Sequence, residues 1–435
     1  MHQIFPRNEN DLTQLQKLYE ESDKVNFWKA PSKINKSVDI MVPQVEKRNF
    51  LDFLSKHHMT STIVVKDLVK LLKAKEFDLR SQIRLRYPNE RRLNDDYSRK
   101  LYLRMGEYYS YVEISWWLKY LEQKFPNLVE VISIGKTYEE RSIYGVKIGA
   151  KKREPSRIIW IDGGIHAREW ASVHTALYFV NELVSGYEND ALITKYLNLL
   201  DFYIFPCVNP DGYEFTRTDQ YDPAIRFWRK NRSPQKCFAH NGSQFCCKGV
   251  DLNRNFDFHF AEVGASSSPC SEIYRGENAF AELETKAIRD KVLSIKDRLD
   301  AFITLHTYSQ LWIYPYSHKK NAYPSDVNDL KNVAKQAVES LFKLYGTMYR
   351  YGTGPETIYA YSGGSSDWVK QNTPTKYTYT IELRPSSFNW NGFVLDKRQL
   401  IPTARETFEG VKVVIDKIIE EHKFDPRKSI FNDYR

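Results

Sequence analysis

The sequence predicts an α/β fold in two parts, a small α/β domain followed by a larger domain with a mostly parallel or mixed sheet between helices. Three observations predict it. The chain has 435 residues, too many for one ordinary core. From about residue 97 onward, apolar strand-like runs alternate with helical patterns. A basic segment at 73–100, interrupted by Pro88, separates this region from the residues before it.

The first 75 residues alternate helical and strand patterns at the spacing of a small domain. Leu12, Leu15 and Leu18 suit one face of a short helix. The other expected elements are a strand at 38–43, a helix at 45–57, a strand at 62–65 and a helix at 67–72. None of them carries an obvious chemical motif, so this part is interpreted as a small domain without chemistry of its own.

The basic segment at 73–100 marks a change of composition. Basic runs are most often solvated helix faces or linkers. An exposed linker between two domains is open to proteolysis, and Arg91-Arg92 would suit a trypsin-like protease. We therefore predict a domain boundary near residue 95.

The larger region supplies strands and helices in alternation. Strands are expected at 157–162, 202–206, 301–305 and 376–381, and helices at 170–184, 280–295 and 405–421. Such an order predicts a sheet with helices on both faces. Functional residues in these sheets collect beyond the carboxyl ends of the strands.

Composition excludes several classes of protein. Hydrophobic residues make up 42% and charged residues 27%, the balance of a folded soluble chain. No stretch approaches the ~18–20 apolar residues of a membrane span. The net charge of +9 is spread along the chain, whereas a nucleic-acid binder would usually concentrate it in one stripe.

Two strand ends carry residues that ligate metals. His166 and Glu169 follow the strand at 157–162, and His306 follows the strand at 301–305. Two histidines and a glutamate, with a fourth position left to water, are the ligands of a hydrolytic zinc site. Taken singly, the first pair could equally be a salt bridge or helix cap, and His306 a hydrogen-bonded core residue.

Other candidates carry charge for catalysis or binding. Glu382 ends the strand at 376–381, where it could exchange a proton with water or form a salt bridge to Arg384. Arg229 and the Asn253-Arg254 pair offer guanidinium and amide donors that match a carboxylate. Each arginine alone could equally be a surface residue.

Together these motifs closely resemble the zinc metallocarboxypeptidases of the pancreatic A/B type. The matching blocks are 163–170 (GGIHAREW), 208–213 (VNPDGY), 228–230 (WRK), 251–255 (DLNRN), 306–310 (HTYSQ), 358–359 (IY), 362–368 (SGGSSDW) and 381–384 (IELR). They occur in the family's order from about Tyr97 to the last helix, and a chance match of this kind is very rare.

The resemblance implies a fold and a division of the chain. The family fold is a mixed eight-stranded sheet flanked by helices, preceded by a small antiparallel α/β sandwich that blocks the groove until a protease cuts the connecting helix. Residues 1–95 resemble this activation pro-segment, with a basic connecting helix at about 75–95, and residues 96–435 resemble the catalytic domain.

The resemblance also implies a role for each motif. One Zn²⁺ per chain is expected, with His166, Glu169 and His306 as its ligands. Glu382 is expected to be the general base and Arg229 to stabilise the oxyanion. The expected substrate-binding residues are Arg168, Asn253, Arg254, Tyr308, Tyr359 and Ser366.

The preferred C-terminal residue depends on the floor of the specificity pocket, which in the family is apolar in the A type and acidic in the B type. The matching residue is Ser366, which is neither. A hydroxyl cannot neutralise a buried Lys or Arg, so a neutral or aromatic residue is expected unless Glu356 reaches the pocket. Ser317 and Gly354 are small and leave room for a bulky residue.

The cysteines bear on the cellular location. By the resemblance, Cys247 and Cys270 form a disulfide, whereas pairing of Cys237 with Cys246 is left open. Cys207 is expected to be a buried thiol. Disulfides and zymogen logic favour a secreted protein, although no apolar leader opens the sequence.

The leading hypothesis is therefore a secreted zymogen of a zinc exopeptidase, which releases one C-terminal amino acid at a time. We expect a monomer that acts on peptide and protein C-termini after cleavage by a trypsin-like protease. The alternatives are a B-type enzyme for Lys and Arg, and a non-catalytic protein on the same fold.

Overall fold

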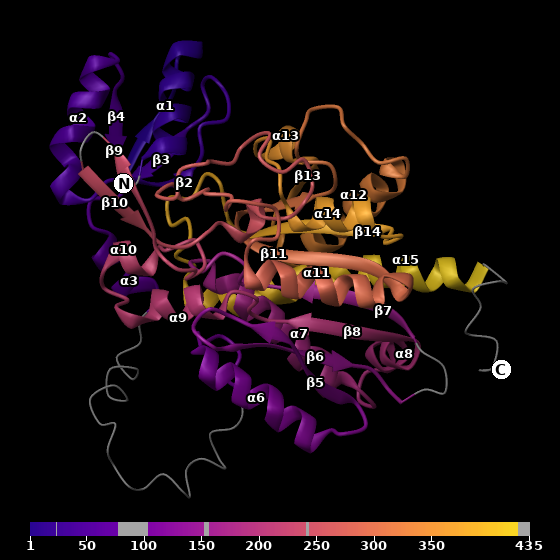
Figure 1. Ribbon diagram of the computed structural model, residues 1–435. Helices are drawn as coiled ribbons and strands as arrows, with labels where there is room; N and C mark the ends of the chain where they lie inside the picture. The colour runs from indigo at the N-terminus through magenta and orange to yellow at the C-terminus, as the bar shows by residue number, and fades with distance from the viewer. Residues whose placement is uncertain (23, 77–102, 152–155, 241–242, 425–435) are drawn as a thin grey trace, which may run out of the picture.

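The computed structural model describes residues 1–22, 24–76, 103–151, 156–240 and 243–424 (Figure 1). Nearly all of the expected connecting helix at 75–95, with Arg91-Arg92 and the boundary near residue 95, lies outside these ranges. Those three expectations remain predictions. Among the described residues, no helix has both the length and the apolar character to cross a membrane.

The N-terminal part is a four-stranded antiparallel sheet in the order β2-β3-β1-β4. Its strands are β1 (His2–Ile4), β2 (Asn26–Lys29), β3 (Val38–Met41) and β4 (Ser61–Ile63). Its helices are α1 (Glu9–Glu21), α2 (Lys47–Lys56) and α3 (Leu68–Lys75). Leu15 of α1 and Phe50 of α2 pack with Ile40 of β3 in one apolar cluster. The predicted small antiparallel α/β sandwich is confirmed.

The larger part has an eight-stranded sheet in the order β13-β12-β14-β11-β7-β8-β6-β5. The strands are β5 (Val129–Lys136), β6 (Ser142–Ile148), β7 (Arg157–Asp162), β8 (Leu200–Phe205), β11 (Leu299–Ser309), β12 (Leu311–Ile313), β13 (Arg350–Gly352) and β14 (Tyr377–Ser386). The central strands β14, β11, β7 and β8 are parallel. Antiparallel pairs, β12 with β14 and β6 with β8, border them, so the sheet is mixed as predicted.

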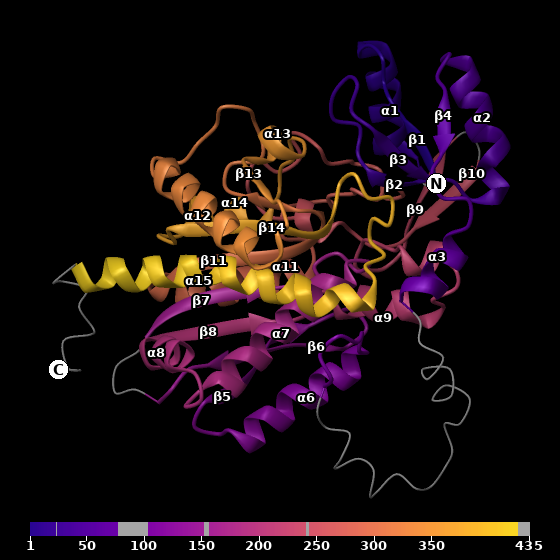
Figure 2. The same cartoon turned by 180° about the vertical axis from the view of Figure 1, so that it is seen from behind.

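Helices cover both faces of this sheet (Figures 1 and 2). One face packs against α6 (Tyr111–Lys124), α7 (Trp170–Gly186), α8 (Ala191–Leu199), α12 (Val327–Tyr345) and α15 (Leu400–Phe424). The other packs against α11 (Leu283–Ile295) and α14 (Ser365–Asn372). Alternation along β7 explains both cores, because Ile159 and Ile161 enter the first and Ile158 and Trp160 the second.

Shorter elements complete the fold. They are α9 (Pro210–Thr218), α10 (Pro223–Arg226), α13 (Gly354–Thr357), β9 (Lys236–His240) and β10 (Ser243–Cys247), with 3-10 turns at Gln44–Glu46, Leu252–Arg254, Lys296–Arg298 and Lys397–Gln399. Two predicted helix boundaries were wrong. The helix expected from 280 begins at Leu283, because Phe280 has a φ of 55°, outside the helical range. The last helix, expected from residue 405, begins at Leu400, directly after the turn that Asp396 caps.

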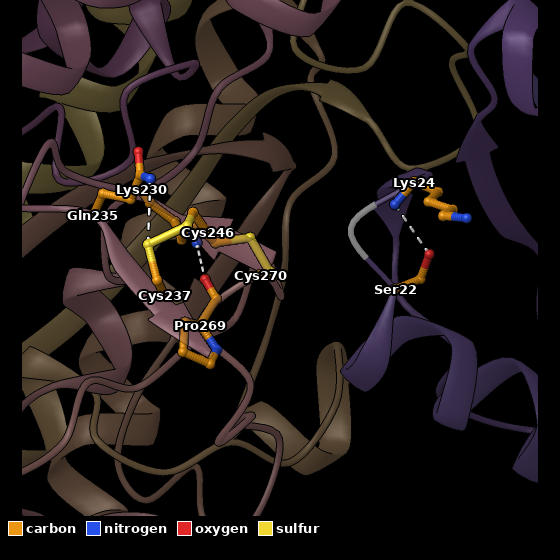
Figure 3. Close-up of a disulfide and its surroundings, with 9 residues drawn as sticks. Ser22, Lys24, Lys230, Gln235, Cys237, Cys246, Pro269 and Cys270 are labelled. Atoms are coloured by element: carbon orange, nitrogen blue, oxygen red, sulfur yellow. Dashed lines mark hydrogen bonds between the residues drawn. A yellow bond between two sulfur atoms is a disulfide. The ribbon is translucent and has the colours of Figure 1, made fainter. Parts of the chain in front are cut away.

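Two disulfides are present. Cys247 bonds to Cys270, as the resemblance implied, and Cys237 bonds to Cys246, the pairing that the sequence left open. Cys237 and Cys246 lie directly opposite each other on the β9–β10 hairpin (Figure 3). Cys207 is a buried free thiol, as expected.

Candidate active site

Three parallel strands deliver the candidate residues to one edge of the sheet. β7 runs into Gly163-Gly164, where a Cβ on Gly163 would lie 2.8 Å from the Ser172 carbonyl oxygen. This close turn leads directly to His166 and Glu169. Within the sheet, His306 on β11 pairs in register with Glu382 on β14. The strand order therefore brings residues far apart in the sequence to one place.

His166, Glu169 and His306 form a compact group with a ligand atom from each within 4.8 Å of the others. Their exposed fractions are 3%, 2% and 1%. Glu169 Oε1 lies 2.8 Å from His166 Nδ1, and Glu169 Oε2 lies 3.1 Å from His306 Nδ1. Burial alone would raise the pKa of Glu169, but the two histidines outweigh it and hold that pKa below its usual range. The set of two imidazoles and one carboxylate fits zinc.

Asp251 contacts both His166 and Arg229. Its Oδ1 lies 3.1 Å from His166 Nε2, and its Oδ2 accepts a hydrogen bond from Arg229 Nε at 2.9 Å. A carboxylate on the second ring nitrogen orients a metal-binding histidine. The sequence did not single out Asp251, although it opens the 251–255 block.

Glu382 has a buried oxygen, Oε2, with no hydrogen-bond partner among the residues described. Burial raises its pKa to about 8; Glu169 adds to the rise, while His306 and Arg229 oppose it. The alternative salt bridge with Arg384 is not formed, since Arg384 Nε donates instead to Glu406 at 2.7 Å. Glu382 therefore has an oxygen free to exchange a proton.

A basic region lies beside the group. Arg254 is 2% exposed; its Nε donates to the Gly264 carbonyl at 2.7 Å and its Nη2 to the Tyr359 hydroxyl at 3.3 Å. The Asn253 side-chain oxygen accepts from the Ser365 amide at 3.0 Å, which leaves its NH₂ group for a ligand. Arg229 and Arg254 both form ion pairs with Asp251, and Arg229 Nη1 also lies 4.0 Å from Glu169 Oε1.

Ser366, expected at the floor of the specificity pocket, is buried, and its hydroxyl lies 2.9 Å from that of Thr380. The neighbouring Asp367 accepts from the Ser317 amide at 2.7 Å, and burial raises its pKa to about 7. Glu356, the acid that could have favoured basic residues, is exposed and accepts hydrogen bonds from the Thr353 amide and the Tyr323 hydroxyl, both at 2.8 Å. Its carboxylate is engaged in capping α13.

The N-terminal part covers two of the expected substrate-binding residues. Arg168 Nη1 donates to the Asn26 side chain at 3.0 Å and Arg168 Nη2 to the Phe27 carbonyl at 3.3 Å. The Tyr308 hydroxyl donates to the Trp28 carbonyl at 3.1 Å. All three partners lie on β2, which therefore takes up the hydrogen-bonding groups of Arg168 and Tyr308.

A further acid at this interface was missed from the sequence. Glu272 accepts from Arg168 at 3.3 Å and also binds the Asn26 side chain and the Phe27 amide. It lies two residues after Cys270, and only the disulfide next to it hinted at a fixed position.

Comparison with known proteins assigns the family. A model of the zinc carboxypeptidase family matches residues 114–410, and a carboxypeptidase activation peptide model matches residues 2–75. Carboxypeptidase B of Astacus astacus is 46% identical over 71% of this chain and 95% of its own length. Carboxypeptidase A2 of Mus musculus is 37% identical over 96% of this chain and 93% of its own.

Solved structures agree. Thrombin activatable fibrinolysis inhibitor has a TM-score of 0.78 at 31% identity, covering 96% of this chain and 98% of its own. Carboxypeptidase A from Helicoverpa armigera has a TM-score of 0.80 at 26% identity, covering 97% and 98%. Matched along both of its parts, the chain belongs to the zinc carboxypeptidase family and carries that family's activation peptide.

Proposed function

We propose that His166, Glu169 and His306 hold the zinc ion of this metallocarboxypeptidase and that Glu382 is its general base. The observation that carries the proposal is the buried His/Glu/His group beside a glutamate oxygen that has no partner among the described residues. When bound, zinc supplies a positive charge that polarises a carbonyl and makes water more acidic.

The chain's own residues supply the remaining steps. Arg254 and Asn253 bind the substrate's C-terminal carboxylate. Tyr359, which accepts a hydrogen bond from Arg254, closes over the substrate. Burial favours protonated Glu382 in the metal-free site, whereas the positive charge of a bound zinc ion would favour its carboxylate. As a carboxylate, Glu382 accepts a proton from the water whose oxygen attacks the scissile carbonyl carbon. Arg229 donates to the oxyanion that develops. As the C–N bond breaks, Glu382 returns the proton to the leaving amine.

The residue preference follows from the pocket floor. We infer that it is neutral or aromatic, because Ser366 and Thr380 offer hydroxyls and the carboxylate of Glu356 is engaged elsewhere. The similarity to a carboxypeptidase B favours the alternative, a preference for Lys and Arg.

The setting follows from the activation peptide and the disulfides. We infer a secreted monomer, activated when a trypsin-like protease cuts the basic segment between the two matched regions. Two disulfides support an oxidising compartment.

The test combines metal content with turnover. Zinc is measured in the purified chain by atomic emission. Hydrolysis of blocked dipeptides ending in Phe, Leu, Ser, Glu, Lys or Arg is then followed before and after limited trypsin treatment, with C-terminal amides as matched controls. We expect one zinc per chain and turnover of the free acids only, after cleavage. Zinc without turnover of any peptide would instead favour a non-catalytic protein.

A further inference from the structure

Two large aromatic side chains project from the loop that follows β14. Phe388 is 87% exposed and Trp390 is 51% exposed. Asn389 between them fixes a turn, since its amide donates to the Ser386 carbonyl at 2.9 Å. Single exposed apolar residues are common on protein surfaces, so the position of this pair decides whether it indicates a binding site.

This loop lies against β2. Lys29 Nζ donates to the Ser387 carbonyl at 3.4 Å. At the other end of the loop, a Cβ on Gly392 would lie 2.3 Å from the Trp28 ring, so the loop backbone is in close contact with β2. Figures 1 and 2 both show the yellow loop beside β2.

Tyr308, Phe393 and Trp28 belong to one apolar cluster at the end of this loop. Tyr308 follows His306 by two residues, and its ring centroid lies 5.1 Å from that of Phe393. The ring centroid of Phe393 lies 5.4 Å from that of Trp28 and 4.1 Å from the guanidinium carbon of Arg168. The loop with Phe388 and Trp390 comes directly before Phe393 in the sequence.

The surface formed by Arg168, Tyr308 and Phe393 suits an extended polypeptide, because the strand β2 already lies against it. When the C-terminal carboxylate of a substrate binds Arg254, the residues that precede the scissile bond must extend away from Arg254. The side chains that β2 occupies, Arg168 and Tyr308, become available once the pro-segment is removed.

We propose that Phe388 and Trp390 form a rim subsite that binds apolar or aromatic side chains of the substrate polypeptide, several residues before the scissile bond. The inference rests on the proposed function. Aromatic rings offer a large apolar area with few rotatable bonds, so they bind at low entropic cost. Contacts that are equally strong in the ground state and in the transition state change KM and leave kcat unchanged, and we expect this of the rim subsite.

The test compares the double variant Phe388→Ser/Trp390→Ser with the parent after activation. Trp116→Ser is the matched control, since Trp116 is also 51% exposed but lies on α6, on the other side of the molecule from β2 (Figure 1). Three substrates share the same two C-terminal residues: a blocked dipeptide, a nonapeptide with Leu and Phe upstream, and a nonapeptide with Ser and Gly upstream.

We expect kcat/KM for the apolar nonapeptide to fall about tenfold in the double variant, through KM, or ~1.4 kcal/mol. The dipeptide and the polar nonapeptide should change less than about twofold, as should every substrate with Trp116→Ser. An equal change for all three substrates, or none for the apolar nonapeptide, would overturn the subsite.

A binding arm separates this inference from the proposed function. Calorimetric titration of the activated Glu382→Gln chain with the apolar nonapeptide needs no turnover. We expect binding to weaken about tenfold when Phe388 and Trp390 are also replaced, even if the parent hydrolyses nothing. Unchanged affinity would contradict the subsite, whereas absent turnover in the parent contradicts only the proposed function.

Discussion

Replacing Ser366 with Asp is expected to redirect the enzyme towards C-terminal Arg and Lys. The Ser366 side chain is buried and its hydroxyl lies 2.9 Å from that of Thr380. An aspartate would place a carboxylate at the pocket floor, where the Thr380 hydroxyl can donate a hydrogen bond to it. A basic substrate side chain would then find an opposite charge instead of a neutral hydroxyl.

The size of the effect follows from electrostatics. Two unit charges about 4 Å apart attract by about 4 kcal/mol at an effective dielectric constant of about 20. Desolvation of both charges offsets part of this attraction. We take the net gain as roughly 2–3 kcal/mol, which raises kcat/KM for C-terminal Arg about 30–150-fold over the parent.

The assay is the ratio of kcat/KM for blocked dipeptides ending in Arg and in Phe. Ser366→Asn is the matched control, because it has the shape of Asp without the charge. The Asp variant should raise the Arg/Phe ratio and the Asn variant should leave it near the parent value. Equal ratios for the two variants would refute the placement of Ser366 at the floor of the pocket.

Three further predictions concern catalysis, support of the site and stability. Glu382→Gln should lower kcat by about 10²–10⁴-fold while the chain keeps its zinc, because only the proton acceptor is lost; steady-state kinetics with metal analysis check this, and loss of zinc would contradict it. Asp251→Asn should weaken zinc affinity about 10–100-fold, since Asp251 orients His166, as measured by competition with a chelator; unchanged affinity would count against that role. Burial lowers the pKa of His174 to about 3 from 6.5, so the unfolded chain binds a proton between pH 6.5 and 3 that the folded chain does not. The free energy of unfolding should therefore decrease as the pH falls below 6.5, by about 2 kcal/mol at pH 5 from this residue alone. Urea unfolding at several pH values checks it, and His174→Gln should flatten the dependence.

The sequence predicted the parts of the site that depend on strand ends. His166, Glu169, His306 and Glu382 each follow or end an apolar strand, and parallel strands bring such ends together. The small sandwich was predictable for the same reason, because its apolar periodicity is local. Local patterns also favoured most helices, with errors of a few residues at their ends.

Contacts between distant segments could not be predicted. The register that sets His306 opposite Glu382 and the position of Asp251 behind His166 are properties of the assembled sheet and loops. The pairing of Cys237 with Cys246 depends on the β9–β10 hairpin, and no spacing rule fixes it. The same holds for Glu272, whose three contacts cross from one part of the chain to the other.

The most direct test of the central claim is anomalous X-ray diffraction at the zinc absorption edge from crystals of this protein. The account predicts one strong anomalous peak within bonding distance of His166, Glu169 and His306, at about 2.0–2.2 Å from a nitrogen or oxygen of each. A peak elsewhere, or a zinc-loaded protein with no peak among these three side chains, would contradict it.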